Sequence, residues 1–231
     1  MAHELKTPLT ALLLVGDSLT AQVNDRSKVL VERLQRELLR LQRLVGDLLE
    51  LSRLETAAPD QALRRERVDL PELLRNVWSN LQPLASRRGV KLHLESDVEL
   101  HLEADGQRLH RALLNLLDNA LRHSPEGGEI EVALDQSQGW CRISIRDHGQ
   151  GLGEEELERM FERFYRGDPA RTKVQGGGSG LGLAIVQQIV MTHRGRVQAG
   201  NHPDGGALIE VLLPLQPSAE HRREVSSRRR D

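Results

Sequence analysis

A histidine, a carboxylate and a hydroxyl stand close together at the start of the chain: His3, Glu4 and Thr7. In a helix, residues four apart share a face, so His3 and Thr7 would project together with Glu4 beside them. A neutral imidazole is a competent nucleophile near pH 7, and a neighbouring carboxylate can orient it. Pro8 should bend the helix, because proline removes a backbone donor. The segment predicts an exposed covalent site at a kink; the alternative is an ordinary surface histidine near a chain end.

Two asparagines four residues apart, Asn115 and Asn119, are expected on one face of a helix. Two side-chain amide oxygens at that spacing can hold a hard cation such as Mg²⁺, which takes its other ligands from water and phosphates. Arg122, three residues further on, could pair with a phosphate oxygen. The alternative is that both asparagines satisfy the backbone of a buried helix.

The sequence Asp147-His-Gly-Gln-Gly151 ends an expected strand. A carboxylate there can accept from the exocyclic amine of an adenine, while Gly149 and Gly151 let the backbone approach the ring. The alternative for such a short pattern is a plain turn.

A glycine-rich stretch, residues 176–183, precedes a clean helical run. The glycines favour a flexible flap, and the helix start beyond it favours an anion. The stretch is neither a Walker loop nor a dinucleotide fingerprint. The helical run argues against a disordered linker.

These groups need elements to position them, and the first two elements are amphipathic helices at 3–23 and 27–54. The second helix carries a heptad stripe: Leu34, Leu38, Leu41, Val45 and Leu48. Further leucines widen the stripe beyond the reach of one neighbour, so we expect a homodimer that closes a four-helix bundle. The alternative is a hairpin packed on its own downstream domain.

The remaining chain alternates helices with short strands that look antiparallel. We expect a dimerisation and phosphotransfer hairpin over 1–55, a linker over 56–68, an α/β sandwich over 69–216 and a disordered basic tail over 217–231. Expected helices are 69–88, 105–123, a short one from 154, and 181–193; expected strands are 90–94, 99–102, 129–134, 141–147, and two around a turn at 201–206.

Composition excludes several classes of function. The net charge is −2 and aromatic residues make up 2% of the chain, which argues against a direct nucleic-acid partner. One cysteine, Cys141, excludes an internal disulfide. No run of eighteen apolar residues is present, so nothing here is expected to span a membrane.

The motifs, taken in order, resemble those of bacterial sensor histidine kinases of two-component systems. The resemblance is carried by five boxes in the family's order: His3-Glu-Leu-Lys-Thr-Pro8, Asn115-Leu-Leu-Asp-Asn119, Asp147-x-Gly-x-Gly151, Phe161-Glu-Arg-Phe164 and Gly178-Ser-Gly-Leu-Gly-Leu183. It implies a helical-hairpin dimerisation bundle followed by an ATP-binding domain of the Bergerat (GHKL) type, with ATP and Mg²⁺ as cofactors. Among such kinases the chain most resembles the phosphate-sensing class.

The resemblance also implies residue roles. His3 would receive the γ-phosphoryl group. Glu4 would orient or deprotonate the His3 imidazole, and Thr7 would position water during dephosphorylation of the partner. The nucleotide site would comprise Asn115, Asn119, Arg122, His123, Asp147, Gly149, Gly151, Gly178, Ser179, Gly180, Leu181 and Gly182, with Asn115 and Asn119 on the metal. Gly178, Gly180 and Gly182 match the lid over the nucleotide and its hinge. Phe161 and Phe164 match the aromatic pair that anchors this lid, and a core role explains them equally well.

The resemblance implies further that the phosphoryl group passes to an aspartate on a response regulator of the winged-helix class. Two departures stand out. His123 occupies the place of a family tyrosine near the adenine, and the match begins within two residues of Met1. In the family, sensor and membrane segments lie upstream, so we expect this to be the cytoplasmic catalytic part of a membrane-associated receptor. The rival functions are a GHKL ATPase of the gyrase or chaperone kind and a silent nucleotide-binding scaffold.

Overall fold

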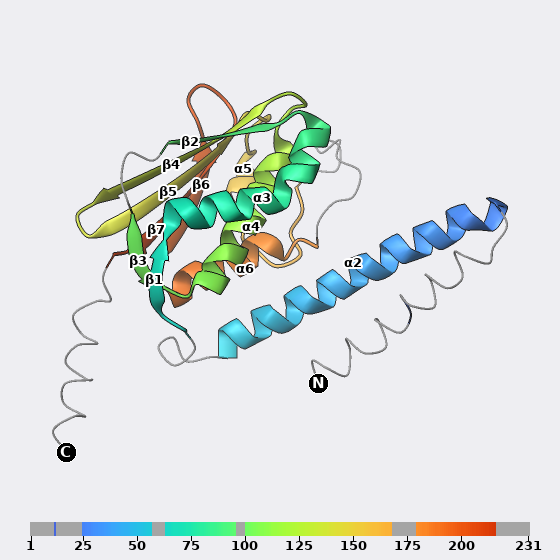
Figure 1. Cartoon of the computed structure of the whole chain (residues 1–231), viewed down its shortest axis with the longest axis horizontal. Helices are drawn as coiled ribbons and strands as arrows, with labels where there is room; N and C mark the ends of the chain where they lie inside the picture. Colours follow the sequence, from blue (N-terminus) through green and yellow to red (C-terminus); the bar gives the residue numbers. More distant parts are fainter. Residues whose placement is uncertain (1–11, 13–24, 57–62, 96–99, 168–178, 216–231) are drawn as a thin grey trace, which may run out of the picture.

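The computed structural model describes residue 12 and residues 25–56, 63–95, 100–167 and 179–215. The expected helix over 3–23 and the expected basic tail therefore lie outside the described residues, apart from Leu12. A long helix, α2 (Asp25–Thr56), leads into an α/β domain (Figure 1).

The domain is built on a five-stranded mixed sheet in the order β2-β4-β5-β7-β6. Its strands are β2 (Lys91–Glu95), β4 (Glu129–Ser137), β5 (Trp140–Asp147), β6 (Arg196–Asn201) and β7 (Ala207–Pro214). A separate two-stranded antiparallel ribbon joins β1 (Glu66–Asp69) to β3 (His101–Ala104).

Three helices cover one face of the sheet: α3 (Leu70–Arg88), α4 (Gly106–His123) and α6 (Gly182–Thr192) (Figure 1). A short fourth helix, α5 (Glu154–Arg159), follows β5. The apolar side chains between the helices and the sheet form one continuous core. Inward and outward residues alternate along β5 and β7, as expected for a sheet with one buried face.

Local sequence explains where the helices begin and end. Asp69 caps α3 by accepting from the backbone N–H of Glu72 at 2.8 Å, and Gly89 ends that helix at φ +66°. Asp105 caps α4 in the same way, accepting from the N–H of Arg108 at 3.1 Å. These two caps fix the first turns of α3 and α4, the helices that follow the two strands of the ribbon.

The structure corrects two expectations about the strands. Residues 66–68, which looked like linker, belong to β1, because Glu66 to Asp69 pair with Ala104 to His101 of β3. A four-residue strand rich in charged residues carries too little periodicity to be recognised. The strands also looked antiparallel throughout, whereas β2 and β4 pair in parallel. The chain between them passes through β3 and α4, a crossover long enough for parallel pairing.

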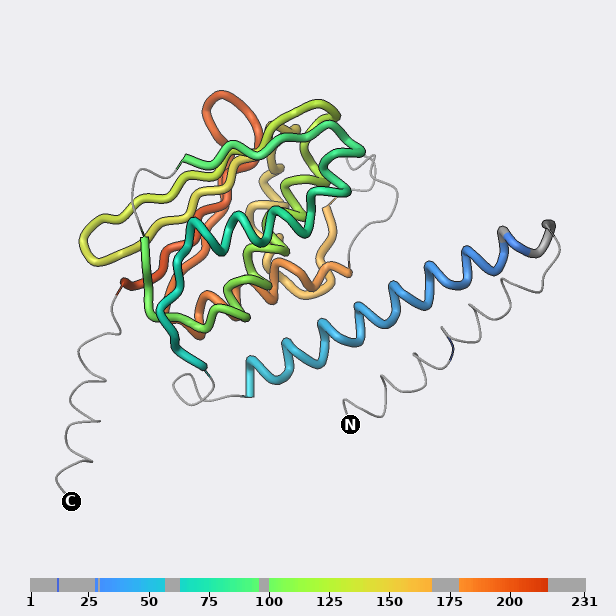
Figure 2. The backbone as a smooth tube through the Cα atoms, in the orientation of Figure 1, coloured from blue at the N-terminus to red at the C-terminus, as the bar shows by residue number. Residues whose placement is uncertain are grey.

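The last turns of α2 pack on the α/β domain. Leu51 and Leu54 are buried in the common core, and Gln188 of α6 donates to the carbonyl of Leu54 at 3.4 Å. Most of α2 extends away from the domain (Figure 2). Its leucines Leu34 and Leu41 are about half exposed in the single chain. Within the described residues, α2 thus contacts its own α/β domain at its C-terminal end.

Two further features concern reactivity and membrane association. Cys141 is fully buried in β5, and burial raises the pKa of its thiol to about 12. Among the described residues, no helix is both long enough and apolar enough to cross a membrane.

A buried histidine joins α6 to the start of α4. His193 Nε2 accepts from the backbone N–H of Asp105 at 3.1 Å, and its Nδ1 lies 2.8 Å from the carbonyl of Ile189. A neutral imidazole satisfies both contacts, with Nδ1 as the donor and Nε2 as the acceptor. Burial lowers the pKa of His193 below its usual 6.5, and the nearby cations Arg65 and Arg108 act in the same direction.

We expect the protein to lose stability as the pH falls below 6.5. Below pH 6.5 the histidine of the unfolded chain binds a proton more readily than His193 of the folded chain, whose pKa is lower. The stability contributed by neutral His193 is therefore present above pH 6.5 and declines below it. Urea unfolding between pH 8 and pH 5 measures this. The variant His193→Gln should show a flatter profile, whereas exposed His93→Gln should keep the wild-type slope. Equal slopes in all three proteins would contradict the prediction.

Candidate functional site

The carboxylate expected to read adenine, Asp147, is 5% exposed at the end of β5. Its Oδ1 accepts from two backbone amides, that of Gly149 at 2.9 Å and that of Ala207 at 3.1 Å. Within the described part of the chain no group bonds Oδ2, and Asp147 lines a pocket. A buried carboxylate that lines a pocket and has one oxygen without a hydrogen bond is suited to accept from a ligand amine.

Two glycines allow the backbone to crowd around this carboxylate. A Cβ on Gly149 would lie 2.6 Å from the carbonyl oxygen of His123, which ends α4. A Cβ on Gly206, whose φ is +85°, would lie 1.7 Å from the carbonyl oxygen of Asp147. Only glycine fits either position without moving the pocket wall.

The loop after Asp147 is fixed by β6. Asn201, the last residue of β6, accepts from the N–H of Leu152 at 2.6 Å and donates to its carbonyl at 2.8 Å. Gly151 has φ +75°, and a Cβ there would meet Asn201 Oδ1 at 2.6 Å. The expected loop glycine therefore packs against an asparagine amide.

Helix α4 brings two of its polar residues to the same pocket. Asn119 and His123 line the pocket with Asp147, and His123 is exposed. Asn115 lies one turn earlier and donates to the carbonyl of Gly182 at 3.2 Å, which leaves its side-chain oxygen available. Arg122 pairs with Asp118 at 2.8 Å, so a phosphate would share this guanidinium with a carboxylate.

The end of the glycine-rich stretch joins α6 to the segment after α5. Gly180 has φ +72°, and a Cβ there would lie within 3.0 Å of the Phe164 backbone. Phe164 donates its N–H to the carbonyl of Gly180 at 2.9 Å, while its side chain is 54% exposed. Phe161 instead packs on the core. Leu181 is fully buried, backbone included, so it faces no ligand in this arrangement.

The same segment touches α2. Ser179 donates its hydroxyl to Asp47 Oδ2 at 3.1 Å. Arg111 of α4 pairs with Asp47 at 2.8 Å and also forms an ion pair with Glu50. A residue of the expected nucleotide lid is thus bonded to the long helix.

Two hollows in the described structure compete as the site. The one around Asp147 has a volume of about 50 Å³, far below the roughly 300 Å³ of a typical small-molecule site. A base can therefore enter only if residues that line the pocket move outward. The second hollow, of about 410 Å³, lies between β1, α3 and α4.

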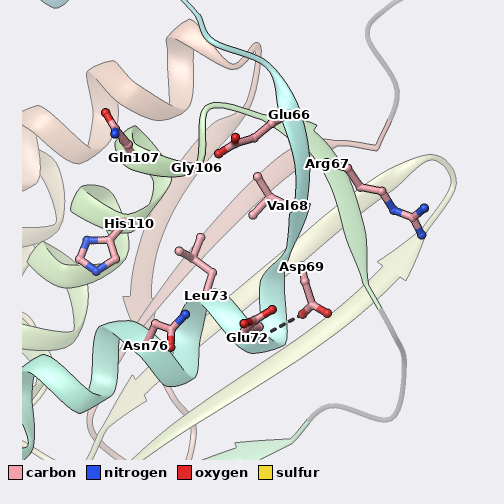
Figure 3. Close-up of a pocket in the computed structure, with 10 residues that line it drawn as sticks. All are labelled: Glu66, Arg67, Val68, Asp69, Glu72, Leu73, Asn76, Gly106, Gln107 and His110. Carbon is pink, nitrogen blue, oxygen red and sulfur yellow. Dashed lines mark hydrogen bonds between the residues drawn. The ribbon is translucent and has the colours of Figure 1, made fainter.

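The larger hollow contains none of the residues singled out by sequence. Figure 3 shows its polar side chains spread around the apolar Val68 and Leu73, with Asp69 occupied in capping α3. The smaller pocket is lined by a buried carboxylate, Asp147, an α4 asparagine, Asn119, and a loop glycine, Gly151. We therefore assign the candidate site to the smaller pocket on its chemistry.

Some predicted site residues cannot be placed: His3, Glu4, Thr7 and Gly178 lie outside the described residues. Sequence reasoning missed Asn201 and Gly206. The turn that contains Gly206 was recognised, but nothing in its sequence indicated that it folds onto Asp147.

Comparison with known proteins adds two family matches. Residues 1–57 match the His Kinase A (phospho-acceptor) domain, and residues 104–217 match the family of histidine kinase-, DNA gyrase B- and HSP90-like ATPases. Sensor protein SphS of Synechococcus elongatus is 44% identical over 236 residues, covering 100% of this chain. The chain belongs to the sensor histidine kinase family. Its fold is accordingly a phospho-acceptor helical region followed by a GHKL-type α/β domain.

Solved structures of this family resemble the chain over nearly its whole length. Full-length ShkA in complex with AMPPNP has a TM-score of 0.77 at 30% identity, covering 94% of this chain and 45% of that one. The kinase ThkA in complex with the response regulator TrrA has a TM-score of 0.68 at 25% identity, covering 94% and 60%. The chain spans 57% of SphS, so it matches little more than half of that relative's length.

The contact of Gly206 with Asp147 predicts a difference between two neighbouring glycines. Gly205 and Gly206 both have positive φ, +94° and +85°, but only at Gly206 would a Cβ meet another atom within 4 Å. We expect Gly205→Ala to cost about 1–2 kcal/mol from backbone strain alone, and Gly206→Ala to cost clearly more because Asp147 must shift. Denaturant unfolding of the two variants checks this. Equal losses would show that the contact is relieved without cost.

Proposed function

We propose that this chain is the catalytic portion of an ATP-dependent protein-histidine kinase. It transfers the γ-phosphoryl group of ATP to His3, passes it to an aspartate of a response regulator, and also dephosphorylates that regulator. The observation that carries the proposal is the pocket around Asp147 in a chain whose first 57 residues match a phospho-acceptor domain.

Recognition of the base follows from the geometry of Asp147. Oδ1 is fixed by the amides of Gly149 and Ala207, so Oδ2 is held in one direction and can accept from the exocyclic amine of adenine. A guanine presents a carbonyl at that position, and two acceptors would then face each other. The structure of ShkA with AMPPNP supports an adenine nucleotide as the ligand.

The phosphates would extend from this pocket along α4 toward α6. Asn119 lines the pocket and Asn115 lies one turn away with its side-chain oxygen available, so both fit a Mg²⁺ site that takes its remaining ligands from phosphates and water. In the described part of the chain no cluster of three or more His, Cys, Asp or Glu could hold a metal, which is consistent with amide ligands. When bound, the metal offsets charge on the triphosphate.

His3 supplies the nucleophile, with Glu4 to orient its ring and Thr7 to position water for dephosphorylation. The lid residues Ser179 and Gly180 exclude water from the phosphates. Arg122, although paired with Asp118, is close enough in sequence to Asn119 to contact a phosphate oxygen as well. The half-exposed leucines of α2 support a homodimer, since a second copy would bury them.

We place the partner among receiver domains of response regulators, of the winged-helix class, and the chain in the phosphate-sensing class on its motifs. ThkA in complex with TrrA supports a regulator as the partner. The chain would work at the cytoplasmic side as part of a membrane-associated receptor.

The phosphoryl acceptor is tested by labelling. Purified protein with Mg-ATP should acquire an acid-labile, base-stable label, and His3→Gln should abolish it, because a phosphoramidate requires the imidazole nitrogen. His93→Gln, which removes an exposed histidine of β2, should keep the label. Label retained in His3→Gln would exclude His3 as the acceptor.

The same assay distinguishes the histidine kinase from the two rival functions. Steady phosphate release without protein-bound label would favour a GHKL ATPase. Those enzymes use a glutamate to activate water where this chain has Asn115, so hydrolysis should be feeble here. ATP binding without label under any condition would favour a scaffold.

Base recognition is tested by Asp147→Asn. An amide can keep an oxygen toward the amides of Gly149 and Ala207, but it then turns a donor toward the amine of adenine. We expect ADP affinity to fall about 10- to 100-fold, corresponding to roughly 1.4–2.8 kcal/mol. Calorimetric titration with ADP measures this. Unchanged affinity would remove Asp147 from base recognition.

A further inference from the structure

Arg146 and His148, the residues on either side of Asp147, both contact the carboxylate of Glu131, on the face of the sheet away from the helices. Neighbouring residues on a strand point to opposite faces, so Arg146 projects away from the helices while Asp147 projects toward them. Arg146 Nη1 lies 3.3 Å from both oxygens of Glu131, its cross-strand partner on β4. His148 Nε2 lies 2.7 Å from Glu131 Oε1.

Arg146 also holds the turn between β6 and β7. Its Nε and Nη2 donate to the carbonyl of Gly205 at 3.3 and 3.2 Å. That turn carries Gly206, which packs on the Asp147 carbonyl, and leads directly into Ala207, whose N–H binds Asp147 Oδ1. One guanidinium therefore connects β4, β5 and the turn that closes the pocket.

The environment of Arg146 shows that these contacts are held firmly. Its side chain is only 12% exposed although it lies on the open face of the sheet. Burial alone would raise the pKa of Glu131, but the hydrogen bond with His148 and the charge of Arg146 hold that pKa below its ordinary value. Glu131 is thus an anion between two partners, and charge-assisted contacts of this kind are the stronger ones.

We propose that Arg146, anchored by Glu131, is a positioning residue for recognition of the nucleotide base. It holds the Gly205 carbonyl, and through the turn it holds the Ala207 amide that fixes Asp147 Oδ1. Arg146 does not touch the nucleotide; it keeps Oδ2 directed at the base from the far side of the sheet. The inference rests on the proposed function in taking the ligand to be an adenine nucleotide.

The strand supplies a matched control. Arg142 lies four residues earlier on the same face of β5 and also pairs across the sheet, with Asp135 on β4 and Glu210 on β7. It is 49% exposed and lines neither described hollow. Replacing either arginine by methionine removes one charge and one set of cross-strand bonds, but only Arg146 reaches the β6–β7 turn.

The experiment compares Arg146→Met, Glu131→Gln and Arg142→Met in the full chain. The first readout is hydrogen exchange of the Ala207 and Gly149 amides without nucleotide, and the second is calorimetric binding of ADP and of GDP. For Arg146→Met we expect about tenfold faster exchange at Ala207, about tenfold weaker ADP binding and a smaller preference for ADP over GDP. The rate of label formation at saturating ATP should stay within about twofold of wild type. Glu131→Gln should shift exchange and binding in the same direction, and Arg142→Met should shift neither.

Two outcomes would overturn the inference: wild-type exchange and ADP preference in Arg146→Met, or equal losses in Arg146→Met and Arg142→Met. If Arg146→Met does not fold, Glu131→Gln decides on the same readouts. Wild-type protein that binds no ADP would overturn the proposed function instead, and the exchange of the Ala207 amide would still decide whether Arg146 positions the turn.

Discussion

The burial of one carboxylate constrains much of the α/β domain. Asp147 is almost inaccessible to water, and a buried carboxylate must be hydrogen-bonded or be lost as a charge. Its two amide donors come from different segments, the loop after β5 and the start of β7. Both segments must therefore approach the end of β5 closely, which accounts for glycine at 149 and 206 and for the tight β6–β7 turn. The pocket that Asp147 lines lies where these segments meet.

Sequence reasoning located most of the helices and strands of the α/β domain. The periodicity of 105–123 placed Asn115 and Asn119 on α4, and the glycine spacing after Asp147 correctly indicated a loop. What sequence could not give were contacts between distant segments. Asn201 binds Leu152 and Arg146 binds Gly205, pairs separated by 49 and 59 residues. Such pairings depend on strand register, which no local pattern in this chain specifies.

The strand β1 illustrates the same limit at the level of secondary structure. Glu66 and Arg67 are exposed, so a period of two is hardly visible in the sequence. The strand exists because β3 offers it a partner and because Asp69, at its end, caps α3. Tertiary pairing here overrides weak local preference.

The long helix α2 divides its leucines along its length. Leu51 and Leu54 lie under the α/β domain, while Leu30, Leu34 and Leu41 remain accessible for another surface. Detaching the domain would expose the first two side chains, a hydrophobic cost of about 3–6 kcal/mol at roughly 1.5–3 kcal/mol for each leucine. A ligand that binds only the detached arrangement, present at about 1,000 times its Kd, favours that arrangement by about 4 kcal/mol. This is comparable with the hydrophobic cost, so such a ligand could offset the packing of Leu51 and Leu54, and the leucines available to a second copy would not be disturbed.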